Sequence, residues 1–484
     1  MNFNSIEECI FDTAKRFPSK YAIISGAKRV FYSDLADNIK RAAYFYKTNF
    51  ELNTGDRIIV AADKQIEFIY AYFGAHLAGL TVLPVDSGIN NDRLDFIIKQ
   101  ANVRLGVGLK NEGRNIKVIP LSEFSDMSLN EENEIYSIKK DNIADILFTT
   151  GTTGVPKGVP LTFGNIVQAA ENINTFIKNT EDDIELLALP LSHSFGLGRL
   201  RCVFAKGATI VLINGFTNMK KLFRIMGEEK VTGFTMVPAS WRYIKKFSGE
   251  KIKEFSTQLK YIEMGSAFFS AEEKRELASI LPNTRVCMHY GLTEASRSAF
   301  MEFHEDDAFL DSVGKASPNT EITIFDEAGK PVSGESEGEI CIKGNHVTQG
   351  YMSISRENSF YGDYFRTGDW GYKNSQGYIY LVSRYKELIN VGGKKVSPIE
   401  VEEQLKKING ISDCACIGVP DPSGILGEVV KAFIVKDEKS AIDFEEIKNQ
   451  MKGKLEDYKL PAIYEWITEI PKTHNGKIQR LSLK

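Results

Sequence analysis

Short apolar runs alternate with amphipathic segments over the first part of the chain, from about residue 55 to about residue 300. Apolar runs typical of buried strands occupy positions 58–62, 81–85, 143–149, 184–189, 208–213, 233–237 and 285–290. Amphipathic segments at 219–227 and 271–280 predict helices between some of these strands. Such strand–helix alternation predicts parallel sheets with helices packed on their faces.

The pattern changes after about residue 314. Apolar runs at 321–325 and 339–343, separated by turn-rich segments, predict β-hairpins. Near residue 384 it changes again, to a glycine pair, a short helix from residue 398, strands near 414–419 and 429–435, and a helix through residue 447. This last part predicts a separate α+β lobe of about a hundred residues, an ordinary size for a small domain.

Composition and charge narrow the class of protein. A chain of 484 residues is long enough for more than one domain. Its 60 basic residues nearly balance its 64 acidic ones, which argues against nucleic acid as the main partner. Of its 6 cysteines only Cys414 and Cys416 lie close together, and their spacing is that of neither a zinc site nor a thioredoxin motif. We therefore expect reduced, structural cysteines in a cytoplasmic protein.

The sequence predicts neither a signal peptide nor a transmembrane helix. Its first residues include acidic side chains and no apolar core of a signal peptide, although Ser5 and Glu8 have the spacing of a helix capping box. The most apolar long stretch, residues 68–85, is interrupted by His76 and Gly79. It predicts a buried helix followed by a strand, and we expect no transmembrane segment.

A predicted strand runs directly into the sequence TTGTTGVPKG at residues 149–158. Glycines let the backbone approach an anion, threonine hydroxyls add donors, and a lysine supplies a compact positive charge, so the loop suits a polyphosphate. Its spacing is not that of a Walker loop, and a flexible connector is the ordinary alternative for this composition. The candidate nucleotide-binding residues here are Thr149, Thr150, Gly151, Thr152, Thr153, Gly154 and Lys157.

This loop closely resembles the signature loop of the adenylate-forming superfamily, which includes acyl-CoA synthetases, peptide-synthetase adenylation domains and luciferases. Further blocks resemble that family in the same order along nearly the whole chain: LPLSHSFGLG (189–198), HYGLTEAS (289–296), GEICIKGNHVTQGY (338–351), YFRTGDWG (364–371), SRYKELINVGGKKVSPIEVE (383–402) and PKTHNGKIQR (471–480).

The resemblance implies an α/β fold. It implies a large N-terminal domain at 1–385, with parallel-type sheets sandwiched by helices plus a distorted β-barrel, which binds ATP and the carboxylic acid. It also implies a small, mobile α+β C-terminal domain at 386–484, joined at a hinge near Lys386. Gly392 and Gly393 would line the approach of a thiol.

The resemblance also implies the roles of the nucleotide site. Tyr290, followed by Gly291, would stack on the base, Thr293 would bond a phosphate and Glu294 would bind Mg²⁺. Asp369 would accept hydrogen bonds from the ribose hydroxyls, which suits a two-oxygen carboxylate, and Arg384 would contact ribose or phosphate. Core packing, a turn position and a surface salt bridge are the ordinary alternatives for such a tyrosine, aspartate and arginine.

Lys477 resembles the catalytic lysine, which bridges the acid's carboxylate and the phosphate and stabilises charge as pyrophosphate leaves. His193 resembles the histidine of acyl- and aryl-CoA ligases. It stands where amino-acid-activating relatives usually have an aspartate, so an α-amino acid is disfavoured, because a buried ammonium without a partner is costly.

The candidate acyl-pocket residues are Phe195, Trp241, Gly265, Ala267 and Phe268, which would bound an aryl or medium-length acyl group. Arg199 and Arg201 are alternatives that would receive a polar or second acidic group. The chain departs from the family at Gly265-Ser-Ala-Phe268, which lacks the usual proline, at Met288, where many relatives have an amide, and at Ser383.

The expected reaction has two halves. ATP, with Mg²⁺, activates a carboxylic acid as an acyl-adenylate and pyrophosphate leaves; the thiol of CoA then takes the acyl group and AMP leaves. Positioning and electrostatics suffice for this chemistry, so no nucleophilic serine or cysteine is needed. One alternative is a stand-alone enzyme that loads an acyl or amino acid onto the phosphopantetheine of a carrier protein. An alternative of another class is a phosphoryl-transferring ATPase, which the missing Walker spacing disfavours.

Overall fold

The computed structural model describes residues 3–63, 65–110, 116–125, 127, 136–150, 156–384, 387–392, 394–437, 440–472 and 478–483. The chain divides into two compact units. The first comprises Met1–Ile322 and Ile342–Phe365, and the second Thr323–Cys341 and Arg366–Lys484. The domain boundary near Lys386 stays a prediction, and Lys386 itself lies outside the described residues.

A six-stranded sheet of the first unit has the order β6-β5-β3-β4-β7-β8. Its pairs are parallel from β6 to β7, and only β8 runs antiparallel to its neighbour. Its strands are β3 (Arg57–Ala62), β4 (Thr81–Asp86), β5 (Val103–Val107), β6 (Lys117–Ile119), β7 (Ile143–Thr150) and β8 (Pro156–Thr162).

A nine-stranded sheet of the same unit has the order β15-β14-β13-β12-β11-β9-β10-β1-β2. Its central pairs, from β13 to β1, are parallel, and its edge pairs are antiparallel. Its strands are β1 (Tyr21–Ser25), β2 (Lys28–Phe31), β9 (Ile184–Leu187), β10 (Thr209–Leu212), β11 (Gly233–Met236), β12 (Tyr261–Met264), β13 (Arg285–Tyr290), β14 (Ala299–Glu302) and β15 (Lys315–Ala316).

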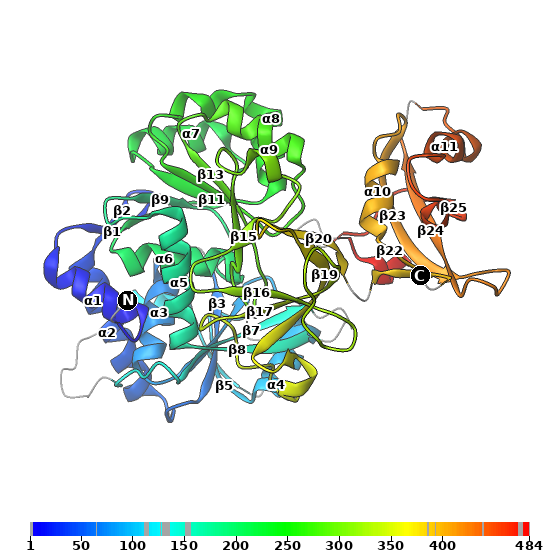
Figure 1. Ribbon diagram of the computed structural model, residues 1–484. Helices are drawn as coiled ribbons and strands as arrows, with labels where there is room; N and C mark the ends of the chain where they lie inside the picture. The colour runs from blue at the N-terminus through cyan, green and yellow to red at the C-terminus, as the bar shows by residue number, and fades with distance from the viewer. Residues whose placement is uncertain are drawn as a thin grey trace. The chain divides into compact units, whose positions relative to one another are not determined.

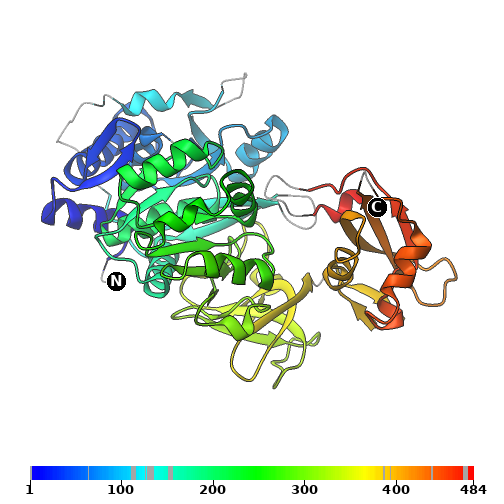
Figure 2. The same cartoon turned by 90° about the horizontal axis from the view of Figure 1, so that it is seen from above.

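Helices cover the faces of both sheets, as the alternating pattern predicts. The helices of this unit are α1 (Ile6–Arg16), α2 (Tyr32–Asn49), α3 (Ile66–Leu77), α4 (Asn91–Ala101), α5 (Phe163–Ile177), α6 (Ser194–Lys206), α7 (Met219–Glu228), α8 (Pro238–Ser248) and α9 (Ala271–Ile280). Figure 1 shows α5 and α6 between the two sheets, and one hydrophobic core joins them to strands of both. A second core lies between the nine-stranded sheet and α7, α8 and α9, which Figure 2 shows in green from above.

Several local predictions are confirmed. The apolar stretch at 68–85 is a buried helix, α3, followed by the strand β4. None of the described helices has the length and hydropathy needed to traverse a bilayer. Ser5 caps α1, because its side-chain oxygen accepts a hydrogen bond from the N–H of Glu8 at 3.3 Å. The run at 184–189 is strand only through Leu187, and a proline without an N–H follows at position 190.

A five-stranded sheet has the order β16-β17-β19-β18, with β20 paired to β19. Its strands are β16 (Glu321–Phe325), β17 (Gly338–Lys343), β18 (Phe360–Tyr361), β19 (Tyr364–Lys373) and β20 (Ile379–Arg384). β16 and β17 coincide with the apolar runs that predicted β-hairpins, so strand formation there is confirmed.

The C-terminal part of the second unit has a core of its own. Its helices lie beside a three-stranded sheet of order β23-β24-β25 (orange to red in Figure 2). Its elements are β21 (Ile389–Val391), β22 (Lys394–Val396), α10 (Pro398–Leu405), β23 (Ile411–Pro420), β24 (Glu428–Lys436), α11 (Phe444–Met451) and β25 (Ile463–Trp466). The predicted combination of helices and strands in this C-terminal part is confirmed. All 6 cysteines of the chain are free and buried.

Candidate active site

The loop after β13 carries the central residues of the predicted nucleotide site. β13 lies in the parallel part of its sheet, so this loop leaves from the carboxyl ends of the strands, where α/β sheets bind ligands. Tyr290, the last residue of β13, is 8% exposed. Gly291 has no room for a side chain, because a Cβ there would lie 2.3 Å from the backbone nitrogen of Arg297.

Glu294 and Thr293 are brought against two other predicted blocks of the first unit. The Glu294 side chain is 6% exposed, and the hydroxyl of Tyr351 donates a hydrogen bond to its Oε1 at 2.7 Å. The hydroxyls of Thr293 and Ser194 lie 3.4 Å apart. Two adjacent residues of the loop after β13 thus contact two blocks that are far apart in the sequence.

Tyr351 also contacts the one lysine of the predicted phosphate loop. The ammonium of Lys157 lies 4.9 Å from the centroid of the Tyr351 ring. Thr149 pairs with Lys157 across β7 and β8, and of Thr150 only the backbone is described. Gly151, Thr152, Thr153 and Gly154 lie outside the described residues. Sequence reasoning gave Tyr351 no role, although it ends the block at 338–351.

A small cavity of about 20 Å³ opens beside Thr293 and Ser194. This volume is enough for one water molecule. It is lined by apolar residues of α5 and by polar side chains that include Arg201, Ser296 and His346. A cavity of this volume is too small to hold an acyl chain.

The predicted acyl-pocket residues differ in their surroundings. Phe195 is buried near the start of α6, and Trp241 is 1% exposed within the core beneath α8. Phe268 is 62% exposed, whereas its neighbour Ala267 is half-buried. A Cβ on Gly265 would lie 2.1 Å from Cε1 of the His289 ring, so this glycine lies directly against an imidazole that sequence reasoning did not single out.

His193 is half-buried at the N-terminal cap position of α6. Its backbone carbonyl accepts a hydrogen bond from the N–H of Leu197 at 3.0 Å, as at the start of a helix. The side chain therefore lies on the loop that leads from β9 into α6, one residue before Ser194.

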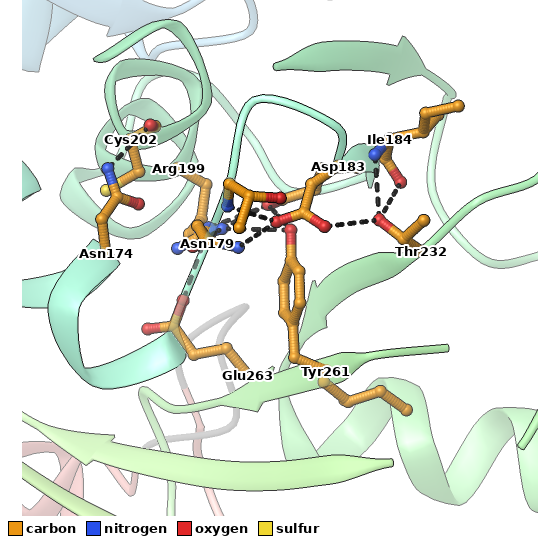
Figure 3. Close-up of polar contacts among 12 residues, drawn as sticks. Asn174, Asn179, Asp183, Ile184, Arg199, Cys202, Thr232, Tyr261 and Glu263 are labelled. Carbon is orange, nitrogen blue, oxygen red and sulfur yellow. Dashed lines mark hydrogen bonds and ion pairs between the residues drawn. The ribbon is translucent and has the colours of Figure 1, made fainter. Parts of the chain in front are cut away.

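Arg199 and Arg201 both have buried acidic partners. The Nε of Arg199 donates to Glu185 at 2.9 Å, and Nη2 donates to Asn179 at 3.2 Å. Figure 3 shows the guanidinium of Arg199 beside Asn179, with Tyr261 and Glu263 next to it. Arg201 forms an ion pair with Asp145 and donates to the hydroxyl of Tyr72 at 2.7 Å.

Asp145 belongs to a longer buried chain of polar groups. The ring of His76 lies between Asp145, 3.3 Å from Nε2, and Glu7, 2.7 Å from Nδ1. Burial lowers the pKa of His76, but the two carboxylates outweigh it and raise the pKa to about 9. The imidazole is therefore protonated at neutral pH and joins α1, α3 and β7.

In the second unit, Asp369 and Arg384 are partners. They lie opposite each other on β19 and β20, and Nε of Arg384 is 2.8 Å from Oδ1 of Asp369. Arg384 also donates from Nη1 to the carbonyl of Thr367 at 3.0 Å. Thr367 in turn accepts the N–H of Asp369 on its hydroxyl at 3.0 Å.

The remaining predicted residues belong to the C-terminal segment. Gly392 has a φ of +58°, a backbone region that favours glycine, and its N–H donates to the carbonyl of Leu426 at 2.8 Å. Lys386, Gly393 and Lys477 lie outside the described residues.

Comparison with known proteins gives a consistent result. Residues 10–352 match the family described as AMP-binding enzyme, and residues 400–477 match the AMP-binding enzyme C-terminal domain. The chain therefore belongs to the AMP-binding enzyme family. It is 29% identical to the oxalate–CoA ligase of Arabidopsis thaliana, over 99% of this chain and 98% of the relative. It is 28% identical to a long-chain-fatty-acid–CoA ligase of Bacillus subtilis, over 99% of this chain and 94% of the relative.

Solved structures agree. ATP-bound MatB from Rhodopseudomonas palustris superposes with a TM-score of 0.90 at 25% identity, covering 99% of this chain and 98% of that one. The predicted adenylate-forming family, the α/β fold class and the acid–thiol ligase class are confirmed. The roles of individual site residues stay predictions.

Proposed function

We propose that this chain uses ATP to convert a carboxylic acid, aryl or fatty acyl rather than α-amino, into an acyl-adenylate, and then transfers the acyl group to the thiol of CoA. The observation that carries the proposal is the meeting of Glu294 and Lys157 on Tyr351: the hydroxyl bonds the carboxylate and the ring lies beside the ammonium. A carboxylate for Mg²⁺ and a cation for phosphate, held by one side chain, are what a Mg²⁺–polyphosphate site requires.

Mg²⁺ fits the groups present. The ion is usually bound by one or two carboxylates together with substrate phosphates, and not by a cage of protein ligands alone. Glu294 has one oxygen engaged by Tyr351 and a second oxygen in the same buried carboxylate. Within the described parts of the chain, no cluster of three or more His, Cys, Asp or Glu side chains could bind a metal. When bound, the ion would neutralise phosphate charge.

The remaining roles are those that the resemblance to the family implies, and the side-chain chemistry is compatible with each of them. The hydroxyl of Thr293 donates a hydrogen bond to a phosphate, and the ring of Tyr290 stacks on adenine. Asp369 accepts from the ribose hydroxyls, and the ion pair with Arg384 holds its carboxylate in one orientation. Lys157 and Lys477 supply positive charge where phosphate charge develops.

Both half-reactions balance without a covalent enzyme intermediate. A carboxylate oxygen of the acid bonds to the α-phosphorus of ATP while the bond to the pyrophosphate oxygen breaks. The sulfur of CoA, after losing its proton, then bonds to the acyl carbon while the bond to the AMP oxygen breaks. Positioning and charge stabilisation are therefore the tasks of this chain's residues.

The test is ATP–pyrophosphate exchange in the presence of Mg²⁺ with a panel of aryl, fatty, dicarboxylic and amino acids. We expect exchange that depends on one class of acid and is lost in Lys477→Ala. Addition of CoA should then yield AMP and an acyl-CoA. Acyl transfer to a carrier protein but not to CoA would favour the carrier-loading alternative instead. ADP as the product would contradict the proposal. A cytoplasmic location stays a prediction that cell fractionation can test.

A further inference from the structure

Basic residues gather in one part of the first unit, the segment 214–260, which includes α7 and α8. This segment has 10 lysines and arginines against 4 acidic residues, a net charge of +6, whereas the whole chain has a net charge of −4. All 10 basic side chains are exposed. α7 and α8 cover the face of the nine-stranded sheet that is turned away from α5 and α6 (Figure 1). Their outer surface therefore concentrates positive charge on an otherwise acidic protein.

Ion pairs neutralise part of this charge. Arg242 and Lys245 on α8 pair with two glutamates of α9, and Arg224 pairs with a glutamate one turn further along α7. Lys260 pairs with the aspartate at position 183. The other basic residues of the segment are lysines that form no ion pair with any described residue: Lys220, Lys221, Lys230, Lys246, Lys251 and Lys253. Half of the positive charge is therefore free to attract an anionic partner.

The free lysines are not equally isolated from negative charge. Two exposed acidic residues, at positions 250 and 254, lie in the same short segment as Lys251 and Lys253. No acidic residue lies within the first turn of α7, where Lys220 and Lys221 stand, or in the last turn of α8, where Lys246 stands. The excess of positive charge is therefore largest at these three lysines.

An exposed phenylalanine lies among these lysines. Phe247, in the last turn of α8, is 57% exposed, and its ring centroid lies 4.4 Å from that of Tyr243. The ammonium of Lys246 lies 5.7 Å from the centroid of Phe247. The hydroxyl of Tyr243 donates to the carbonyl of Thr217 at 3.3 Å, which joins α8 to the segment that leads into α7. An apolar ring and the lysines of both helices thus belong to one surface.

The kind of cation distinguishes between possible partners. Both arginines of the segment are paired with glutamates, and the free cations are all lysines. Protein interfaces are enriched in arginine and depleted of lysine, whereas an anionic lipid surface attracts either cation. We infer that the outer surface of α7 and α8 docks on a membrane that contains anionic lipids, with Lys220, Lys221 and Lys246 at the headgroups and the ring of Phe247 inserted between them. This inference goes beyond the proposed function, because it does not depend on the acid that the ligase activates.

The experiment is cosedimentation of the full chain with vesicles of phosphatidylcholine, with and without phosphatidylserine, at low and at high salt. The wild type should bind only the vesicles that contain phosphatidylserine, and high salt should release it, because salt screens exposed charges. Lys220→Gln/Lys221→Gln/Lys246→Gln should lower the partition coefficient by about 100-fold, since each lysine near such a surface contributes roughly 5-fold. Phe247→Ala should lower it by about 10-fold, because the apolar ring no longer leaves water on docking.

A second triple variant provides the matched control. Lys15→Gln/Lys99→Gln/Lys139→Gln removes the same amount of charge from exposed positions of the first unit outside the segment 214–260. It should bind the anionic vesicles within about 3-fold of the wild type, because charges further away than a Debye length are largely screened. Thermal unfolding of every variant verifies that it is folded.

Several outcomes would overturn the inference. One is a wild type that does not bind vesicles with phosphatidylserine at low salt, and another is a folded variant of the three α7 and α8 lysines that binds as the wild type does. Equal losses in both triple variants would assign binding to net charge and not to this surface. Retention on immobilised poly-glutamate without vesicle binding would indicate an acidic protein partner instead. Vesicle binding requires neither ATP nor a carboxylic acid, so failure of the proposed function, seen as absence of pyrophosphate exchange, is a separate result.

Discussion

The ion pair between Arg199 and Glu185 offers a quantitative test of the charge network under the site. Neither side chain has exposed surface, and Arg199 Nε lies 2.9 Å from Oε1 of Glu185. The hydroxyl of Tyr261 also donates to Glu185, at 2.6 Å. Replacing Arg199 with methionine keeps the volume roughly constant but leaves Glu185 buried without its cation.

The expected cost follows from these contacts. With an effective dielectric constant of about 20, opposite charges 2.9 Å apart attract by about 6 kcal/mol, part of which offsets the desolvation of both groups. Removal of one partner from a buried pair typically costs about 3–5 kcal/mol, and we expect Arg199→Met to lower the free energy of unfolding of the first unit by this amount. Arg199→Met/Glu185→Gln removes the unpaired charge and should recover about 2 kcal/mol or more.

Urea unfolding followed by tryptophan fluorescence measures this loss. The chain has 3 tryptophans, and a Trp370→Phe/Trp466→Phe background leaves only Trp241, which is 1% exposed in the first unit. Arg224→Met is the matched control, because its pair with Glu228 is exposed and should contribute below about 1 kcal/mol. The reasoning is refuted if Arg199→Met costs no more than this control, or if the double variant is no more stable than the single one.

Three further outcomes are expected. The pKa of His76 is about 9 in the fold, against 6.5 for a free histidine, so protonation of this ring stabilises the fold fully below pH 6.5. About 3 kcal/mol of the free energy of unfolding should be lost as the pH rises through 9. His76→Gln should flatten the dependence of this free energy, measured by urea unfolding, on pH. Gly291→Ala should reduce pyrophosphate exchange by about 100-fold, because its Cβ would force the catalytic loop to move; a near-wild-type rate would contradict this. Tyr351→Phe removes the hydrogen bond to Glu294. It should raise the Mg²⁺ concentration for half-maximal exchange by about 10-fold, with a smaller change in kcat. An unchanged Mg²⁺ titration would exclude this positioning role of Tyr351.

The sequence predicts most of the sheet architecture because burial on both faces leaves an unmistakable pattern. The runs that become β3 and β4 are buried at nearly every position, as parallel strands between helix layers must be. Element ends were less predictable: β9 stops before the loop that carries His193, although the apolar run continues to Leu189. The periodicity of side chains does not record where hydrogen bonding between strands ends.

Buried charges were predictable in part. Glu185 and Glu263 interrupt otherwise apolar strands, and a carboxylate at such a position requires a cationic partner. The sequence therefore signals that ion pairs exist. It does not say which cations complete them, because Arg199 and Arg297 come from a helix and a loop that only the packed fold brings to these strands.

In the site, too, the sequence indicates some of the residues but not the partners that contact them. Family blocks indicate Thr293 and Glu294, but Tyr351 has no sequence signal for its contact with Glu294, since 57 residues separate them. Trp241, an aromatic residue of the predicted pocket, is buried in the core beneath α8, and its role in the pocket stays a prediction. Chemistry-bearing side chains are easier to identify than the apolar walls around them, because large apolar residues serve a core and a pocket equally well.

Backbone conformation around His289 is determined by tertiary contacts more than by local preference. Ser266 and Arg297 adopt φ values of +72° and +52°, a region in which a residue other than glycine costs on the order of 1–3 kcal/mol. Ser266 follows Gly265, on which the His289 ring packs. The side chain of Arg297 donates to Oε1 of Glu263, the oxygen that lies 2.7 Å from Nδ1 of His289. Both strained positions thus adjoin residues that contact one imidazole. Such strain persists where surrounding contacts determine the conformation. Here the guanidinium of Arg297 donates to Glu263 at 2.9 Å and to the carbonyl of Phe195, at the start of α6, at 2.9 Å.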